Sequence, residues 1–293
     1  MIVAIAATTA CKRQNEKPRE AELWFGGDVN LGDGGNGQLR NISGMVQGAV
    51  GIVNLEGPVA RGAAARKFRL WNSPQALSEL YAINVRVAGI ANNHAQDFGT
   101  DGQQQTARAL NEHGILAAGG PSGAALLNVN GISIAITAHD LTNGFPAKLE
   151  ADLANARKGA DVLVATFHVT GPVSYLPRPE LKRAVEIAYH AGAKLIVAHG
   201  THAMGPVERR GDTVIAWGLG NVAFACDCTD EEDAILLRVH VQQRSVTSAE
   251  VLPLQAGLNK RPAQPGEDTG GVFDLLEAIG SSKLTRKDNA ASF

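Results

Sequence analysis

The chain has 293 residues, of which 44% are hydrophobic and 19% are charged, and its formal net charge at pH 7 is −2. A chain of this size and composition can bury a substantial core in one large domain. The small charge and the aromatic content of 5% give no electrostatic reason to expect nucleic-acid binding. No apolar run reaches the roughly 18 residues that a membrane-spanning helix needs, so we expect none.

Of the three cysteines in the chain, Cys11 stands in a recognisable context. Residues 1–11 read MIVAIAATTAC and are followed by the polar stretch KRQNEKPRE. A short apolar segment and small residues before a cysteine are typical of a bacterial lipoprotein signal, in which Cys11 would carry the lipid. We therefore expect residues 1–20 to be a signal and polar tether, and the protein to be exported to the cell envelope, with Cys11 as its only membrane attachment. A frayed N-terminus with an incidental cysteine, and a cytoplasmic location, are the alternatives.

Apolar runs and amphipathic segments alternate along the rest of the chain, as an α/β fold requires. The strand-like runs are, in order, AELWFGG, GIVNL, VRVAGIA, GISIAITA, VLVATF, KLIVA, TVIAWGLGN and AILLRVHV. Helix-like patterns cover SPQALSELYAIN, GTDGQQQTARALNEHG and ELKRAVEIAYHAGA. Because both helices and short turns separate the later strands, we expect mixed sheets. We predict one domain over residues 21–255 and a C-terminal extension with a short helix over 256–293. Cys226 and Cys228 are too close for an easy disulfide, and we expect free thiols.

Five of the strand-like runs end in side chains that bind metals. The candidate ligands are Asp28, Glu56, Asn93, His168, His199 and His202. Open α/β sheets place their ligand crevice at the carboxyl ends of the strands, so we expect these side chains to converge. Carboxylate, amide and imidazole groups together can hold one or two divalent cations, such as manganese, zinc or iron. The alternative is that the same groups only cap helices and hydrogen-bond to one another.

Residues beside these candidate ligands indicate how such a site would act. His94 follows Asn93 directly, so we expect it to face the substrate as a general acid while Asp97 orients its ring; both are candidate catalytic residues. Other polar residues near the strand ends are expected to contact the substrate or to hydrogen-bond to the ligands. These are Asn30, Asn92, His139 and Asn221.

Several segments have an order and spacing that resemble the CapA-type poly-γ-glutamate capsule biosynthesis proteins, of the calcineurin-like metallophosphoesterase superfamily. These segments are GGDVNLG, NLEGPV, ANNHAQDFGTDGQQQTARALNEHGI, AHGTHAMGPVE and WGLGNVAF. The resemblance spans residues 21–240 and is most specific over 92–102. It implies a four-layer αββα sandwich of two mixed sheets, a metal site at the six candidate ligands, and His94 as the catalytic histidine. Asn30 stands where phosphoesterases of the superfamily carry a histidine, and no Glu follows His168 as in the family's H-x-G-x-E segment, so substrate contacts would differ.

The residues and the resemblance together predict a metal-dependent, hydrolase-like enzyme at the cell surface, acting on a phosphoester or on a glutamyl or peptide substrate. An anionic polymer, peptide or phosphoester is the expected partner. Basic residues that would suit its negative charges are Arg61, Arg66, Lys67 and Arg69.

Two other classes of protein compete with this prediction. A non-catalytic surface binding protein could keep the same fold, and the missing Glu near His168 favours it. Gly32, Gly34 and Gly37 spell G-x-G-x-x-G, the fingerprint of a dinucleotide-binding oxidoreductase. In that fold the first glycine lies in the turn directly after the strand and a helix follows. Here the first glycine comes too late and the next segment is a poor helix, which disfavours this class.

Overall fold

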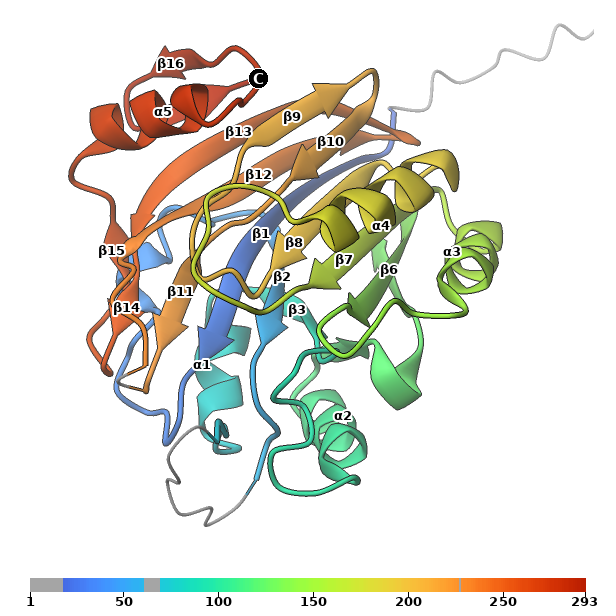
Figure 1. The fold of residues 1–293 in the computed structure, drawn as a ribbon, viewed down its shortest axis with the longest axis vertical. Coiled ribbons are helices and arrows are strands. Elements are labelled where there is room, and N and C mark those ends of the chain that lie inside the picture. Colours follow the sequence, from blue (N-terminus) through green and yellow to red (C-terminus); the bar gives the residue numbers. More distant parts are fainter. Residues whose placement is uncertain (1–17, 61–68, 227) are drawn as a thin grey trace, which may run out of the picture.

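The computed structural model describes residues 18–60, 69–226 and 228–293 (Figure 1). The lipidation site predicted at Cys11 and the basic residues Arg61, Arg66 and Lys67 lie outside this range. Within it, no helix is both long and apolar enough to cross a bilayer.

The larger of two sheets is built around β1 (Glu20–Asn30) and runs in the order β16, β17, β13, β12, β1, β2, β3, β4. Strands β1 to β4 are parallel, whereas β12 and the strands beyond it are antiparallel to their neighbours. The strands on this path are β2 (Val50–Leu55), β3 (Val85–Gly89), β4 (Leu116–Ala118), β12 (Asp233–Gln242), β13 (Ser245–Gln255), β16 (Thr285–Lys287) and β17 (Ala290–Ser292). Three short strands flank it: β11 (Asn221–Phe224) pairs with the end of β1, β14 (Gly257–Leu258) pairs with β11, and β15 (Gln264–Pro265) pairs with β13.

The smaller sheet runs in the order β5, β6, β7, β8, β10, β9. Its central four strands are parallel, and the edge strands β5 and β9 are antiparallel to their neighbours. The strands are β5 (Ala125–Val129), β6 (Ile132–Asp140), β7 (Val162–His168), β8 (Leu195–His199), β9 (Val207–Arg210) and β10 (Thr213–Ala216). Both sheets are therefore mixed, as the sequence predicts.

Alternation along the strands sends side chains to two different apolar clusters. In β1, Phe25 joins the cluster between the sheets, which also contains Val164 of β7, whereas Trp24 faces the helices on the outer side. Helices α1 (Ala76–Ala82) and α2 (Gly102–Glu112) cover the larger sheet through Leu77, Leu80 and Leu110. Helices α3 (Leu149–Lys158) and α4 (Pro179–His190) cover the smaller sheet through Leu153 and Leu181. The predicted four-layer αββα sandwich is confirmed (Figure 1).

The C-terminal part of the chain contains α5 (Thr269–Ala278), which begins where the Asp268 carboxylate accepts a hydrogen bond from the Gly271 N–H. Phe273 and Leu276 of α5 pack against one end of the core between the sheets. β17 pairs with β13, so this segment extends the larger sheet. The division of the chain at residue 255 stays a prediction.

Two loops bear on predictions made from the sequence. The structure pairs Cys226 with Cys228, whose Cα atoms are 5.4 Å apart, a separation that a disulfide can span, and so departs from the expectation of free thiols. After β1, the glycine-rich segment leads only to the three-residue 3₁₀ helix η1 (Arg40–Ile42) and then to β2. A dinucleotide-binding fold needs a full helix with its N-terminus at the glycines. The structure gives that class no support.

Candidate metal centre

The candidate ligands come from the ends of strands in both sheets. Asp28 lies near the end of β1 and Glu56 directly follows β2, while His168 and His199 are the last residues of β7 and β8. His168 and His199 are neighbours in register, so their side chains share one face of the smaller sheet. That face packs against the larger sheet, because Val164, four residues before His168, lies in the core between the sheets. The carboxyl ends of the parallel strands of both sheets therefore lie together at the site.

Asp28, Glu56 and His168 form the centre of this site. Each offers one ligand atom, and these atoms all lie within 4.8 Å of one another. The three residues are 1%, 1% and 2% exposed. His199 Nδ1 lies 4.0 Å from Asp28 Oδ1, and His202 Nδ1 lies 3.7 Å from Asp28 Oδ2. The structure thus gathers four of the other five candidate ligands around Asp28.

The loop after β3 brings the sixth candidate ligand, Asn93, to the same place. Asn93 Oδ1 lies 2.7 Å from His168 Nε2. The neighbouring Asn92 is buried, and its amide donates to the Leu55 carbonyl at 2.8 Å, which ties the loop to the end of β2. The two asparagines therefore have different contacts: Asn93 faces a candidate ligand, and Asn92 holds the loop that carries it.

Asn54 belongs to the site although the sequence analysis does not single it out. Its Nδ2 donates to Asp28 Oδ1 at 2.8 Å, and it also lies 3.5 Å from Glu56 Oε1 and 3.2 Å from His168 Nδ1. Asn92 donates to Asn54 Oδ1 at 3.3 Å. The signal that could have found it is an amide inside the apolar run GIVNL, two residues before Glu56 and hence on the same face of β2. Asn54 connects both carboxylates of the cluster.

The loop after β8 owes its shape to Gly200. The Gly200 N–H donates to Asp28 Oδ2 at 2.9 Å, and its φ of +88° places it in the left-handed region. A Cβ there would lie 2.7 Å from His168 Cε1 and Nε2, so only glycine fits between Asp28 and His168. His202 adopts a φ of +56°, which is uncommon for a residue with a side chain, and its Nδ1 lies 2.8 Å from Asn221 Oδ1. Backbone strain of this kind gathers at functional sites.

Asn30 contacts main-chain atoms at the end of β2. Its Nδ2 donates to the carbonyls of Glu56 and Trp71, each at 3.0 Å. It is 2% exposed, and it therefore holds the segment that carries Glu56. Arg69, the described member of the predicted basic group, lines a small cavity of about 150 Å³ together with Asn30 and Lys260.

His94 and Asp97 form a pair beside the cluster. His94 Nδ1 lies 2.7 Å from Asp97 Oδ2, and the same carboxylate oxygen accepts from the Leu70 N–H at 2.7 Å. Contact at Nδ1 fixes the orientation of the His94 ring and leaves Nε2 without a role in this pair. The His94 side chain is 23% exposed, in contrast to the buried Asp28, Glu56, His168 and His199.

His139 does not join the site. It is in register with Phe167, whose side chain packs under the outer helices, while the next residue, Asp140, is in register with His168. Because successive side chains of a strand point to opposite faces, His139 faces α3 and not the cluster. The structure therefore does not support the expectation that His139 contacts the substrate or hydrogen-bonds to the ligands.

The electrostatics of the cluster favour a bound cation. Burial, and then the charge of Asp28, raise the pKa of Glu56 well above its ordinary value. Burial by itself would raise the pKa of Asp28, but the three histidines and the Gly200 N–H lower it overall. Burial lowers the pKa of His168 to about 4, so its imidazole is neutral, which is the form that ligates a metal.

The residues present fit a divalent metal. Two carboxylates are buried side by side, and among the described ion pairs no Lys or Arg contacts either of them. His199 Nδ1 is buried and has no hydrogen-bond partner in the described structure. A buried carboxylate pair and an unpartnered imidazole nitrogen are costly without a cation and satisfied by one. Asp28, Glu56 and His168 would hold it, with His199, His202 and Asn93 adjoining.

The fold and the site define an α/β sandwich with a candidate metal centre between the carboxyl ends of its two sheets. Residues 22–226 match the model of a family described as Bacterial capsule synthesis protein PGA_cap. The chain belongs to this family, as the sequence motifs predict.

Two curated relatives carry related names. The "PGA biosynthesis protein CapA" of Bacillus subtilis (strain 168) is 28% identical over 229 residues, which are 69% of this chain and 60% of that protein. The "Capsule biosynthesis protein CapA" of Bacillus anthracis is 24% identical over 217 residues, 65% of this chain and 53% of that protein. The chain therefore spans little more than half the length of the curated relatives that it matches.

Two solved structures are also similar. A hypothetical protein from Thermus thermophilus has a TM-score of 0.49 at 14% identity, covering 84% of this chain and 98% of that one. The purple acid phosphatase PPD1 from yellow lupin (Lupinus luteus) seeds has a TM-score of 0.42 at 9% identity, covering 82% of this chain and 52% of that one. Both TM-scores are below 0.5, so neither similarity carries a conclusion about the activity of this chain.

Proposed function

We propose that the protein is a metal-dependent, hydrolase-like enzyme of capsule biosynthesis, exported to the cell envelope. Its substrate is a phosphoester or a glutamyl or peptide bond of an anionic molecule. The observation that carries this proposal is the buried cluster of Asp28, Glu56 and His168, whose ligand atoms lie within 4.8 Å of one another. The names of the two curated relatives support the biological setting.

A divalent metal at this cluster would polarise a substrate oxygen and lower the pKa of bound water towards neutrality. The side chains around it are arranged to keep the ligands in place. Asn54 fixes Asp28 by a hydrogen bond of 2.8 Å, Asn221 holds the ring of His202, and Asn30 holds the main chain of Glu56. Such supporting contacts orient ligands and preserve a site between turnovers.

His94 supplies the proton in this proposal. Asp97 holds Nδ1 of His94, so Nε2 is the atom that donates a proton to the leaving group. The side chains of His94 and His202 are 23% and 21% exposed, whereas those of Asp28 and His168 are buried. His94 and His202 are therefore the members of the site that we expect a substrate to reach from solvent.

The test separates metal binding from catalysis. We expect the protein purified without chelator to contain one or two equivalents of a transition metal, measured by elemental analysis, and to hydrolyse p-nitrophenyl phosphate esters or γ-glutamyl peptides. Asp28→Asn should lose both metal and turnover. His94→Ala should keep the metal and lose turnover, and His190→Ala, at the exposed end of α4, is the matched control that keeps both.

The outcomes distinguish a metal-dependent enzyme from a non-catalytic binding protein on the same fold. Metal in the wild type with turnover that depends on His94 supports the enzyme. Metal that is lost in Asp28→Asn, with no turnover of either substrate group, supports a metal-containing binding protein on the same fold. If no sample binds manganese, zinc or iron after reconstitution, the metal centre itself is wrong.

A further inference from the structure

The chain between β7 and α4 makes a wide loop over residues 169–178, which begins directly after the candidate ligand His168 (Figure 1). The Val169 N–H donates to the His199 carbonyl at 3.0 Å, so the loop leaves the smaller sheet at the metal centre. Further along the loop, the ring of Tyr175 packs against the apolar core between the sheets. The loop therefore starts beside two candidate ligands and is anchored on the core by a tyrosine.

The hydroxyl of Tyr175 makes a contact far away in the sequence. It donates to Glu231 Oε2 at 3.1 Å, across 56 residues. Glu231 lies between β11 and β12, in a segment that belongs to no helix or strand. Among the described hydrogen bonds and ion pairs, this hydroxyl is the only partner of the Glu231 carboxylate. The contact therefore joins the loop after β7 to the chain after β11.

The main chain of Glu231 leads from this contact to the metal centre, through Asn221. Asn221 is the first residue of β11, is fully buried, and is in register with Asp28 of β1. Its Nδ2 donates to the carbonyls of Glu231 and His202, at 3.3 Å and 3.4 Å. Because main-chain carbonyls only accept hydrogen bonds, these two contacts fix which end of the amide is the NH₂ group. The Oδ1 atom of Asn221 then faces His202.

The direction of the Asn221 amide determines the tautomer of His202. Asn221 Oδ1 lies 2.8 Å from His202 Nδ1, and since Oδ1 only accepts, Nδ1 must carry a proton. A neutral imidazole then has its lone pair on Nε2, which is the atom left to meet a metal or a substrate. The edge of the ring also meets Phe224, with ring centroids 5.0 Å apart, but packing of this kind does not distinguish the two nitrogens. The hydrogen bond from Asn221 does.

We propose that Tyr175 is a positioning residue of the candidate metal centre, which acts through Glu231 and Asn221 to keep the proton of His202 on Nδ1. Its hydroxyl holds the Glu231 side chain, and the Glu231 carbonyl in turn fixes the amide of Asn221. This inference rests on the proposed function, because a lone pair kept on His202 Nε2 serves a site in which a metal or a substrate meets it. The competing explanation is that Tyr175 only anchors the loop after β7.

Histidine side-chain NMR of the full-length, metal-free protein tests the orientation of His202. Long-range ¹H–¹⁵N spectra at pH 8, where a free imidazole is neutral, distinguish an Nδ1–H from an Nε2–H imidazole. We expect the His202 signals, assigned by their loss in His202→Gln, to show a single Nδ1–H tautomer in the wild type. Tyr175→Phe keeps the ring on the core and removes only the hydroxyl, and it should shift the His202 signals towards those of the Nε2–H tautomer.

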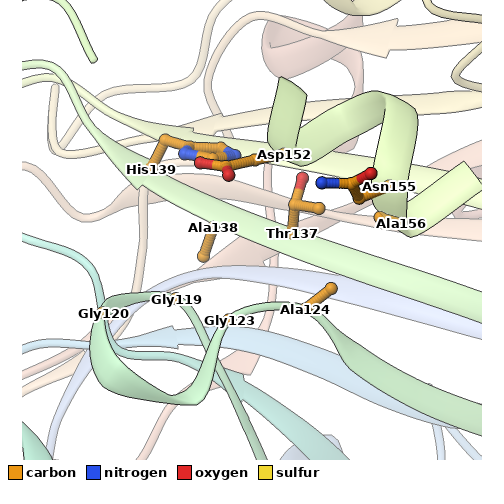
Figure 2. A pocket seen from close by; sticks show the side chains of 10 residues that line it. All are labelled: Gly119, Gly120, Gly123, Ala124, Thr137, Ala138, His139, Asp152, Asn155 and Ala156. Carbon is orange, nitrogen blue, oxygen red and sulfur yellow. The ribbon is translucent and has the colours of Figure 1, made fainter. Parts of the chain in front are cut away.

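Matched variants separate the hydrogen bond from other effects of mutation. Tyr189→Phe removes the hydroxyl of a tyrosine on α4, which has no hydrogen bond among the described residues, and it should leave His202 unchanged. Glu231→Ala removes the acceptor of the Tyr175 hydroxyl and should reproduce the shift, whereas Glu231→Gln keeps an acceptor oxygen and should not. The signals of His139, which faces α3, are an internal reference that no variant should change (Figure 2).

Zinc titration of the same proteins gives a second readout. Loss of one hydrogen bond that holds a ligand should weaken zinc binding about two- to tenfold in Tyr175→Phe, and Tyr189→Phe should bind zinc as the wild type does. If the wild type binds no zinc, manganese or iron, the proposed function is wrong, and the imidazole spectra still decide whether Tyr175 orients His202.

The proposal is wrong if the His202 signals of Tyr175→Phe match those of the wild type, or if Tyr189→Phe changes them as much. A wild type that binds zinc, with the same affinity in Tyr175→Phe, also overturns it, because Tyr175 would then only anchor the loop.

Discussion

Replacement of Gly200 by alanine is the most direct test of the packing inside the candidate metal centre. Gly200 has a φ of +88°, and an added Cβ would lie 2.7 Å from two atoms of the His168 ring. His168 cannot easily move away, because it is 2% exposed and lies between Asn54 and Asn93, at 3.2 Å and 2.7 Å. Gly200→Ala should therefore displace His168 or distort the loop that donates to Asp28.

The expected loss of stability has two parts. A side chain in the left-handed region costs about 1–2 kcal/mol. Overpacking of a buried contact adds roughly 1–3 kcal/mol. Gly48→Ala separates them, because Gly48 has a similar φ of +83° and a Cβ there would meet nothing within 4 Å. Gly48→Ala should show only the loss of stability from the left-handed backbone conformation. Gly200→Ala should show that loss and the loss from overpacking.

The assay is urea unfolding of the metal-free proteins, followed by titration with manganese or zinc. We expect Gly200→Ala to lose more free energy of unfolding than Gly48→Ala, and only Gly200→Ala to lose metal affinity. Equal losses in the two variants, or unchanged metal affinity in Gly200→Ala, would refute the close contact between Gly200 and His168.

Three further predictions concern the buried polar groups. Asn54→Leu should destabilise the protein by roughly 1–3 kcal/mol, because Asp28 loses its buried donor, and should weaken metal binding about 10- to 100-fold in a calorimetric titration. Because the pKa of Glu56 is raised in the folded state, the metal-free protein should lose stability as the pH rises above the ordinary value of 4.5. Glu56→Gln should remove this loss, so in urea at neutral pH without metal it should be more stable than wild type, and it should bind metal less well. The pKa of His168 is lowered to about 4 from 6.5, so His168 contributes stability above pH 6.5 that is lost as the pH falls towards 4. Between pH 6.5 and 4, the free energy of unfolding of His168→Gln should therefore change by roughly 3 kcal/mol less than that of the wild type. An unchanged pH dependence would contradict the burial of a neutral imidazole.

Much of the fold follows from local patterns in the sequence. The hydrophobic pattern around Phe25 is that of a strand, and the pattern of residues 179–190 is that of an amphipathic helix. Burial of the apolar faces of such elements determines that helices cover the outer faces of two packed sheets. The positions of Asp28, Glu56 and His168 were predictable for the same reason, since the carboxyl ends of parallel strands meet at one edge of a sheet. The hydrophobic pattern of one strand was sufficient to predict that a side chain lies at the carboxyl end of that strand.

Other features depend on partners far away in the sequence, and only the tertiary structure decided them. Asn54 became part of the site because β1 and β2 are adjacent, so that its amide reaches Asp28, 26 residues earlier. His139 was excluded because the register of β6 with β7 turned it towards α3, a one-residue difference that no pattern in an isolated apolar run reveals. The sequence by itself determined which groups could ligate a metal and at which strand ends they stand. The pairing and register of the strands decided which of them face one another, because side-chain direction in a sheet alternates with every residue.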